Sequence, residues 1–176
     1  RGGPTNEANR NDDRFYAHAY RRPLEPEVLA DAIAEVTGVS DKYGDQPLGT
    51  RAIALVDPRT PAASLDILGR CSRTASCEGA TTGGGLPAKL HQLNGELNNR
   101  KITAKDGRLH RLIAMAAKDE VIIAEFYLRA LGRNSTAKEM DYWRKRFERV
   151  AASERVEMLE DLVWSILNSS EFGMNR

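Results

Sequence analysis

Two cysteines, Cys71 and Cys77, lie close together in the segment CSRTASC and could form a covalent bond. In an oxidising compartment such a pair can close a loop of about seven residues, which the loop-entropy model values at roughly 2.4 kcal/mol. In a reducing compartment they would be two half-buried thiols. A zinc site made of both thiols and one histidine is a less favoured alternative. The close spacing favours the disulfide.

The three histidines, His18, His91 and His110, show no pattern typical of a cofactor site. None stands at a metal-ligand spacing from another histidine or a cysteine, and the chain has no CxxCH motif for haem attachment. His91 lies next to an apolar stripe in LHQLN, which favours a core or surface role. His18 lies between two tyrosines, where packing or capping is the simplest role. We therefore expect no cofactor in this segment.

Motifs for phosphate binding and for nucleophilic catalysis are also missing from the sequence. The GGG at residues 83–85 precedes a predicted helix, but it lacks the GK[ST] of a P-loop and the strand context of a dinucleotide fold. Ser72 and Ser76 show no nucleophile-elbow motif. We interpret the glycines as a hinge and assign no catalytic residue.

A basic segment at residues 89–111 is the clearest local charge asymmetry. It has six basic residues against two acidic ones, a net charge of +4, whereas the whole chain carries only +1. Such a face could bind an acidic partner or a polysaccharide. Because the chain is nearly neutral, a solvated face balanced by acidic residues elsewhere is the favoured alternative, and a nucleic-acid binder would carry a larger positive excess. The candidate anion-binding residues are Lys89, Arg100, Lys101, Lys105, Arg108 and Arg111.

The first half of the chain combines a polar arm, one secure helix and irregular loops. Residues 1–14 have almost no apolar side chain, which predicts a linker or an arm. Pro23 and Pro26 introduce a predicted helix whose residues from Val28 to Val36 carry a one-sided apolar stripe, with Gly38 at the cap position. RAIALVD at residues 51–57 predicts a short strand. A short helix is expected from Thr60 and Pro61 to Gly69, followed by an irregular segment up to residue 85.

The second half predicts a series of helices with short connections. Apolar residues recur at intervals of three and four over the expected helices. Thr136 and Glu139 have the spacing of a capping box. Trp143 and Trp164 fall on apolar stripes, so we expect both to pack with Phe126 in the core. The expected helices cover residues 86–93, 109–116, 119–131, 136–150 and 156–167.

Together these elements predict a mainly α fold, an antiparallel helical bundle with long irregular loops and at most one or two short strands. We divide the chain into an arm at 1–14, an N-terminal helical part with the cysteine loop at 15–118, and a C-terminal helical part at 119–176 packed on it.

No run of 18 apolar residues is present, so we expect no membrane span. The chain opens at Arg1 without a signal segment, which we interpret as a downstream fragment of a larger protein or a processed product.

Several sequence blocks resemble a planctomycete-specific domain family of unknown function. The blocks are FYAHAYRRPLEPEVLADAIAEVTG, GTRAIALVDP, LDILGR, LHQLNG, FYLRALGR and DLVWSILNSSEF, which span the chain from about Asn11 to its end. The resemblance implies the C-terminal part of a large exported protein, often with a planctomycete-type cytochrome c domain upstream. The family commonly has a CxCER-like stretch where this chain reads CSRTASCEG, so no metal or redox role is transferred to these residues.

A second similarity covers residues 119–172. FYLRALGR, the tryptophan at position 143 and the closing SSEF are similar to a secreted helical domain that is itself similar to phycobilisome linkers. That resemblance implies an interaction module without catalytic activity.

Our leading hypothesis is a non-catalytic interaction or scaffolding domain of an exported protein, located in the periplasm or at the cell surface. Its partners would be upstream domains of the same protein or another protein; a polysaccharide is an alternative, and nucleic acid is not expected. The rival hypothesis is part of an enzyme that acts on cell-surface polysaccharide or in redox chemistry, with some active groups upstream. A deep pocket holding two or more of a small set of titratable residues would favour the enzyme, the set being His18, His91, Asp57, Asp66 and Glu78.

The disulfide hypothesis gives a direct prediction. Mass spectrometry of unreduced protein should find the chain about two mass units lighter than the fully reduced form, because forming one disulfide removes two hydrogen atoms. Two free thiols under non-reducing preparation would contradict both the disulfide and part of the argument for export.

Overall fold

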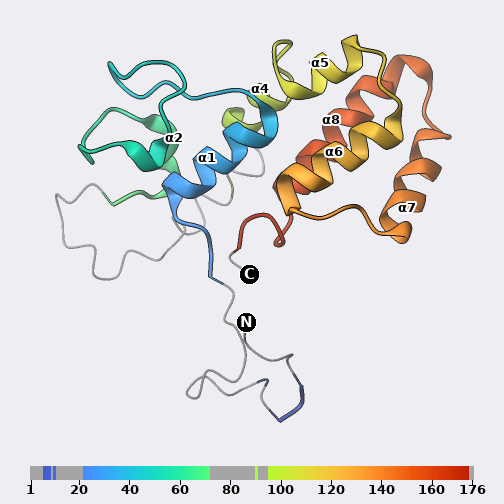
Figure 1. The fold of residues 1–176 in the computed structure, drawn as a ribbon, viewed down its shortest axis with the longest axis horizontal. Helices are drawn as coiled ribbons and strands as arrows, with labels where there is room; N and C mark the ends of the chain where they lie inside the picture. Colours follow the sequence, from blue (N-terminus) through green and yellow to red (C-terminus); the bar gives the residue numbers. More distant parts are fainter. Residues whose placement is uncertain (1–5, 9, 11–21, 72–89, 91–94, 175–176) are drawn as a thin grey trace.

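A computed structural model describes residues 6–8, 10, 22–71, 90 and 95–174 (Figure 1). Over these ranges the protein is mainly α-helical, as predicted, and no strand is found; one isolated antiparallel bridge pairs Pro23 with Met174. None of the described helices combines the length and apolar character that crossing a membrane requires. The helices are α1 (Pro26–Thr37), α2 (Ala63–Leu68), α4 (Glu96–Ile102), α5 (Arg108–Ala114), α6 (Asp119–Leu131), α7 (Ala137–Phe147) and α8 (Arg155–Leu167), with 3-10 turns η1 (Ala52–Ala54) and η2 (Ala152–Glu154).

Helix α1 is the element around which the fold is arranged. Its bounds agree with the sequence prediction: Pro26 stands at its first position, and Gly38 ends it in the left-handed conformation, with φ of 70°. The apolar stripe that includes Ile33 and Val36 is buried. Helix α1 contacts η1, α2, α4, α5 and α6, so it lies between the two halves of the chain.

The predicted strand at 51–57 is wrong, because this segment forms the 3-10 turn η1 followed by extended chain. The carboxylate of Asp31 on α1 accepts hydrogen bonds from the backbone N–H groups of Ala52, at 2.6 Å, and Ile53, at 3.2 Å. These bonds satisfy the free donors at the start of the turn, as a cap does. The apolar run therefore bends over α1 instead of pairing with a strand.

Two further helices differ from the sequence prediction. Helix α2 begins at Ala63 rather than at Pro61, because the hydroxyl of Thr60 donates to the carbonyl of Asp57 in a preceding turn. Helix α4 was not predicted, since ELNNRKI is too polar to show an apolar stripe. The helix expected at 86–93 lies outside the described residues except for Leu90, and so does most of the arm at 1–14.

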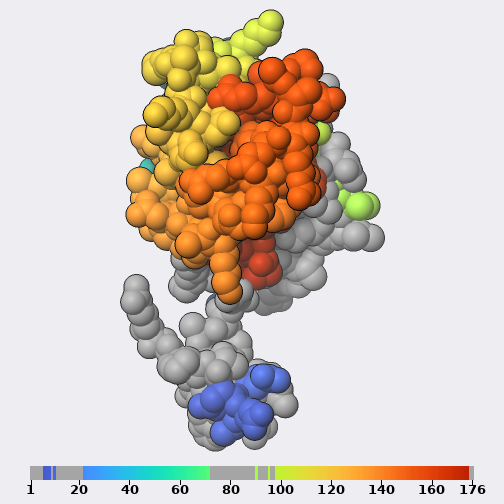
Figure 2. Space-filling view, turned by 90° about the vertical axis from the view of Figure 1, so that its right-hand side faces the viewer, coloured from blue at the N-terminus to red at the C-terminus, as the bar shows by residue number. Residues whose placement is uncertain are grey.

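The last three helices agree closely with the prediction. Helices α6 and α8 lie side by side, and α7, which separates them in the sequence, lies at the right-hand edge of Figure 1. Residues of α5 to α8 form much of the face seen in Figure 2. The capping box of α7 is confirmed: the hydroxyl of Thr136 accepts from the N–H of Glu139 at 3.3 Å, and Glu139 accepts from the N–H of Thr136 at 2.7 Å. Arg133 hydrogen-bonds the same carboxylate and lowers the pKa of Glu139 to about 2.

The core predicted around the aromatic residues is present. Phe126 and Trp143 are buried, and Trp164 is partly buried against the same hydrophobic cluster. The indole N–H of Trp143 donates to the hydroxyl of Tyr127 at 3.2 Å, which satisfies its one polar group. This cluster extends from α1 to α8 without a break, so the C-terminal helices share one core with α1.

A buried ion pair joins α4 to the loop that follows α1. The Nζ of Lys101 lies 2.8 Å from Oδ2 of Asp41, and the side chains of these residues are only 2% and 8% exposed. Burial lowers the pKa of Lys101, while the Asp41 carboxylate opposes that shift. Burial and the same carboxylate both raise the pKa of Tyr43, whose hydroxyl donates to Asp41 at 3.4 Å.

The start of α5 closes the C-terminal end of α1. The guanidinium of Arg108 donates to the backbone carbonyls of Val36, at 3.0 Å, and Glu35, at 2.9 Å. These carbonyls lack partners inside the helix, and the positive charge suits the negative end of the helix dipole. Gly107 permits the approach, because a Cβ there would lie 2.8 Å from the carbonyl oxygen of Ala104.

We predict that Trp143→Ala lowers the free energy of unfolding by about 3 to 5 kcal/mol, the usual cost of emptying a large aromatic site. The measurement is chemical denaturation followed by circular dichroism. Trp143→Phe is the control, since it keeps a six-membered aromatic ring at the site and loses only the pyrrole part of the indole with its bond to Tyr127, so its cost should be smaller. A loss below about 1 kcal/mol for the alanine variant would place Trp143 on the surface.

We predict that Lys101→Met is strongly destabilising, by about 3 to 5 kcal/mol, because it leaves the Asp41 carboxylate buried without its cation. Adding Asp41→Asn to the same protein should recover much of the loss, since the uncompensated charge is then gone. A double-mutant cycle in urea measures both effects. Additive losses would contradict a coupled, buried pair.

Candidate functional site

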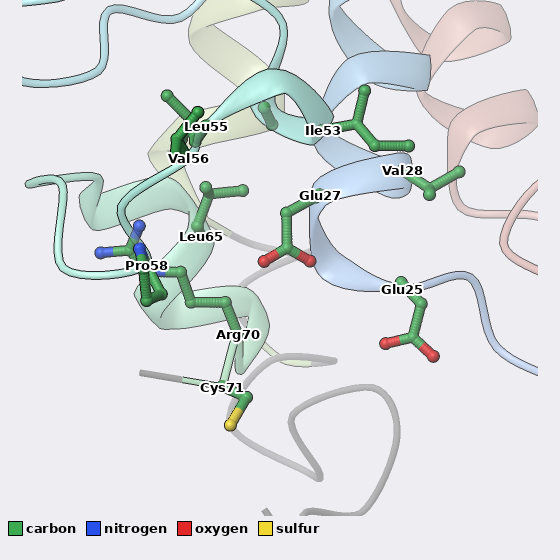
Figure 3. A pocket seen from close by; sticks show the side chains of 11 residues that line it. Glu25, Glu27, Val28, Ile53, Leu55, Val56, Pro58, Leu65, Arg70 and Cys71 are labelled. Atoms are coloured by element: carbon green, nitrogen blue, oxygen red, sulfur yellow. The ribbon is translucent and has the colours of Figure 1, made fainter. Parts of the chain in front are cut away.

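A groove between α1 and residues 52–71 is the best candidate for a functional site among the described residues (Figure 3). Its volume is about 400 Å³, within the range of binding clefts in proteins. One wall comes from the start of α1, and the other comes from η1, α2 and the chain that follows each. The lining residues are Glu25, Glu27, Val28, Ala52, Ile53, Leu55, Val56, Pro58, Leu65, Arg70 and Cys71.

The groove is largely apolar and its apolar surface continues outward. Leu65 is fully buried at the base, while Val28 and Leu55 are half-buried. At the edge, Ile53 is 59% exposed and Val56 is 98% exposed. Large apolar side chains gathered beside a concavity are typical of a surface that contacts another molecule.

Two carboxylates give the groove a negative edge. Glu27 points into the space between α1 and the side chains of Leu65 and Arg70, and Glu25 stands two residues earlier, at the N-cap of the same helix (Figure 3). Neither glutamate forms an ion pair within the described part of the chain. Both stand where the helix dipole favours negative charge, so the fold tolerates them without a cation.

Arg70, the cation among the described lining residues, is already bound within the protein. The Nε of Arg70 lies 2.8 Å from Oδ1 of Asp66, and its Nη2 donates to the carbonyl of Thr60 at 2.6 Å. The Arg70 side chain is only 6% exposed. It therefore holds the chain around α2 in place, and in the described part of the chain it forms no ion pair with Glu25 or Glu27.

A second cleft, of about 470 Å³, lies between the last turns of α1, residues 40–51 and Arg108. Its charged groups are paired with one another or with nearby helices. Asp31 lies 3.4 Å from Arg51, and Glu35 lies 3.0 Å from Arg129. Within the described ranges no three His, Cys, Asp or Glu side chains are grouped so as to hold a metal ion. This cleft is best explained as a network that holds the fold together.

The predicted anion-binding face is not assembled as a set. Lys101 is buried in its pair with Asp41, and Arg108 is bonded to α1. Arg100, Lys105 and Arg111 are exposed, while Lys89 lies outside the described residues. The prediction counted charges along the sequence, whereas the partners of Lys101 and Arg108 are about 60 and 70 residues away.

The titratable residues that would favour an enzyme are not gathered in either cleft. Asp57 pairs with Arg59 and Asp66 pairs with Arg70, and neither lines a cleft described above. Of the histidines, His110 lies 3.1 Å from Glu160 and joins α5 to α8. His18, His91 and Glu78 lie outside the described residues, as do Ser72, Ser76 and the glycines at 83–85.

The cysteine prediction remains open in part. Cys71 lines the groove and does not carry a free thiol. Cys77 lies outside the described residues, so its pairing with Cys71 stays a prediction.

Sequence reasoning missed the groove itself. RAIALVD was interpreted as a strand, so Ile53 and Val56 were not recognised as surface residues. The two glutamates were interpreted only as the start of a helix. One signal was available: the sequence offered no second strand with which this short apolar run could pair.

Comparison with known proteins gives no further guidance to this site. No family model matches the chain, and no curated protein or solved structure matches it either. The resemblance to a planctomycete-specific family therefore remains an expectation from the sequence, and the function must be argued from the groove.

Proposed function

We propose that this chain is a non-catalytic interaction or scaffolding domain of a larger exported protein, and that the groove beside α1 is its contact site. The observation that carries the proposal is the exposed apolar edge at Ile53 and Val56. Burying such surface against a partner is favourable by about 25 cal/mol per Å². The partner would be another domain of the same protein or a separate protein.

The use of charge elsewhere in the described fold supports this proposal. Arg108 joins α5 to α1, Arg155 pairs with Asp119 and so joins α8 to α6, and Arg133 joins the turn before α7 to Glu171. These groups hold helices together and do not converge on one cleft. A rigid helical body that carries an open apolar groove is the arrangement that an interaction domain needs.

The rival hypothesis, an enzyme domain acting on polysaccharide, has one feature in its favour. Glu25 and Glu27 line the same groove, and glycoside hydrolases use two carboxylates. Their chemistry needs the carboxyl groups on either side of a bound sugar, whereas these two residues come from a single helix turn on one wall. The contact-site reading fits that one-sided placement better.

The test is site-specific photo-crosslinking in the cells that make the protein. A photo-reactive amino acid replaces Val56 in one variant and Met115 in the control. Met115 is a matched position, being an apolar residue that is 75% exposed away from the groove. We expect a discrete cross-linked protein species from position 56 and none from position 115, with mass spectrometry identifying the captured segment.

Two outcomes would contradict the proposal. Equal cross-linking from both positions, or none from position 56, would show that the groove is not a contact site. Turnover of an oligosaccharide by the purified chain, abolished by Glu27→Gln with the helical circular dichroism unchanged, would establish the enzyme instead.

A further inference from the structure

We infer that the groove binds a protein segment in which an apolar side chain stands next to a lysine or arginine. This inference rests on the proposed function and adds the chemistry of the partner. It joins two features of one site, the apolar base and edge and the uncompensated carboxylates of Glu25 and Glu27.

The apolar half of the recognition comes from residues on both walls. Leu65 forms the base, and Val28 on α1 faces the η1 turn that carries Ile53 (Figure 3). The turn is held by Asp31, so the two walls are fixed relative to each other before a partner arrives. A preorganised groove of this kind takes one or two aliphatic side chains without paying for its own ordering.

The charged half comes from the start of α1. Glu27 is directed into the groove, and Glu25 lies at the start of α1, across the groove from Cys71 (Figure 3). Arg70, the nearby cation, is bonded to Asp66 and Thr60 and cannot neutralise them. A lysine or arginine beside the apolar side chain of the partner would therefore meet two carboxylates and gain a charge-assisted contact.

The same charges exclude other classes of partner. Nucleic acid, anionic polysaccharide and anionic lipid surfaces all need positive charge on the protein, and the groove offers negative charge. A small aliphatic amine would fill only the cavity itself. It would leave Val56, which is 98% exposed, without a contact, so the continuous apolar edge favours a longer segment.

The experiment measures fluorescence anisotropy of labelled peptides with the purified chain. The probe has the pattern Ser-Leu-Lys-Leu-Lys-Ser, and the comparison peptides replace lysine by glutamate or leucine by serine. We expect the Leu–Lys peptide to bind at least about tenfold more tightly than either comparison peptide. Added salt should weaken its binding, because exposed ion pairs are screened.

Two variants and their matched controls test the two halves separately. The double variant Glu25→Gln with Glu27→Gln should lower the affinity for the Leu–Lys peptide by about threefold to tenfold. Glu154→Gln with Glu157→Gln, which changes the N-cap glutamate and a first-turn glutamate of α8, should leave the affinity for this peptide unchanged. Val56→Asp should abolish saturable binding and Met115→Asp should not, with the midpoint of thermal unfolding recorded for each variant.

The outcomes separate this inference from the proposed function. Cross-linking at position 56 without a preference for the Leu–Lys peptide would overturn the inferred partner chemistry and leave the contact site standing. Failure of cross-linking would overturn both. The inference would also be overturned if no peptide bound saturably or if the Leu–Glu peptide bound equally well. Complete displacement of the Leu–Lys peptide by hexylamine would overturn it too, and would indicate that the groove binds a small amine.

Discussion

The ion pair between Lys101 and Asp41 is the constraint on which the arrangement of the first half depends. Each charge is buried, so neither position tolerates loss of the other. The pair fixes the loop after α1 against α4, and Tyr43 packs beside it with almost no exposed surface. Its main contribution is to specify where this loop lies, because buried pairs add little net stability over apolar packing.

From that fixed loop the polypeptide returns to α1 and forms the groove. The loop brings Ala52 and Ile53 to the Asp31 carboxylate, which accepts both of their N–H groups. Gly44, further back in the loop, donates to the carbonyl of Pro61 and so ties the loop to the segment before α2. Buried polar contacts thus hold one wall of an apolar site in a fixed position.

The sequence predicted those elements whose causes are local. Helices α1 and α6 follow from apolar periodicity with a glycine at the end, and α7 follows from a capping box that needs only two residues three apart. The segment at 51–57 could not be predicted in this way, because the residue that decides its conformation, Asp31, is 21 positions earlier. Lys101 was placed on a basic face for the same reason: its carboxylate partner is 60 residues distant. The groove depends on both of these long-range contacts, so its presence could not be predicted from the sequence.

The bridge between Pro23 and Met174, with Leu24 donating to the carbonyl of Gly173, places the entry and the exit of the described fold at one point. A body whose two chain connections coincide can be inserted into a loop of another protein with little disturbance to the host. Tension applied between those two connections would act first on this short bridge. It would reach the helices only after the bridge had separated.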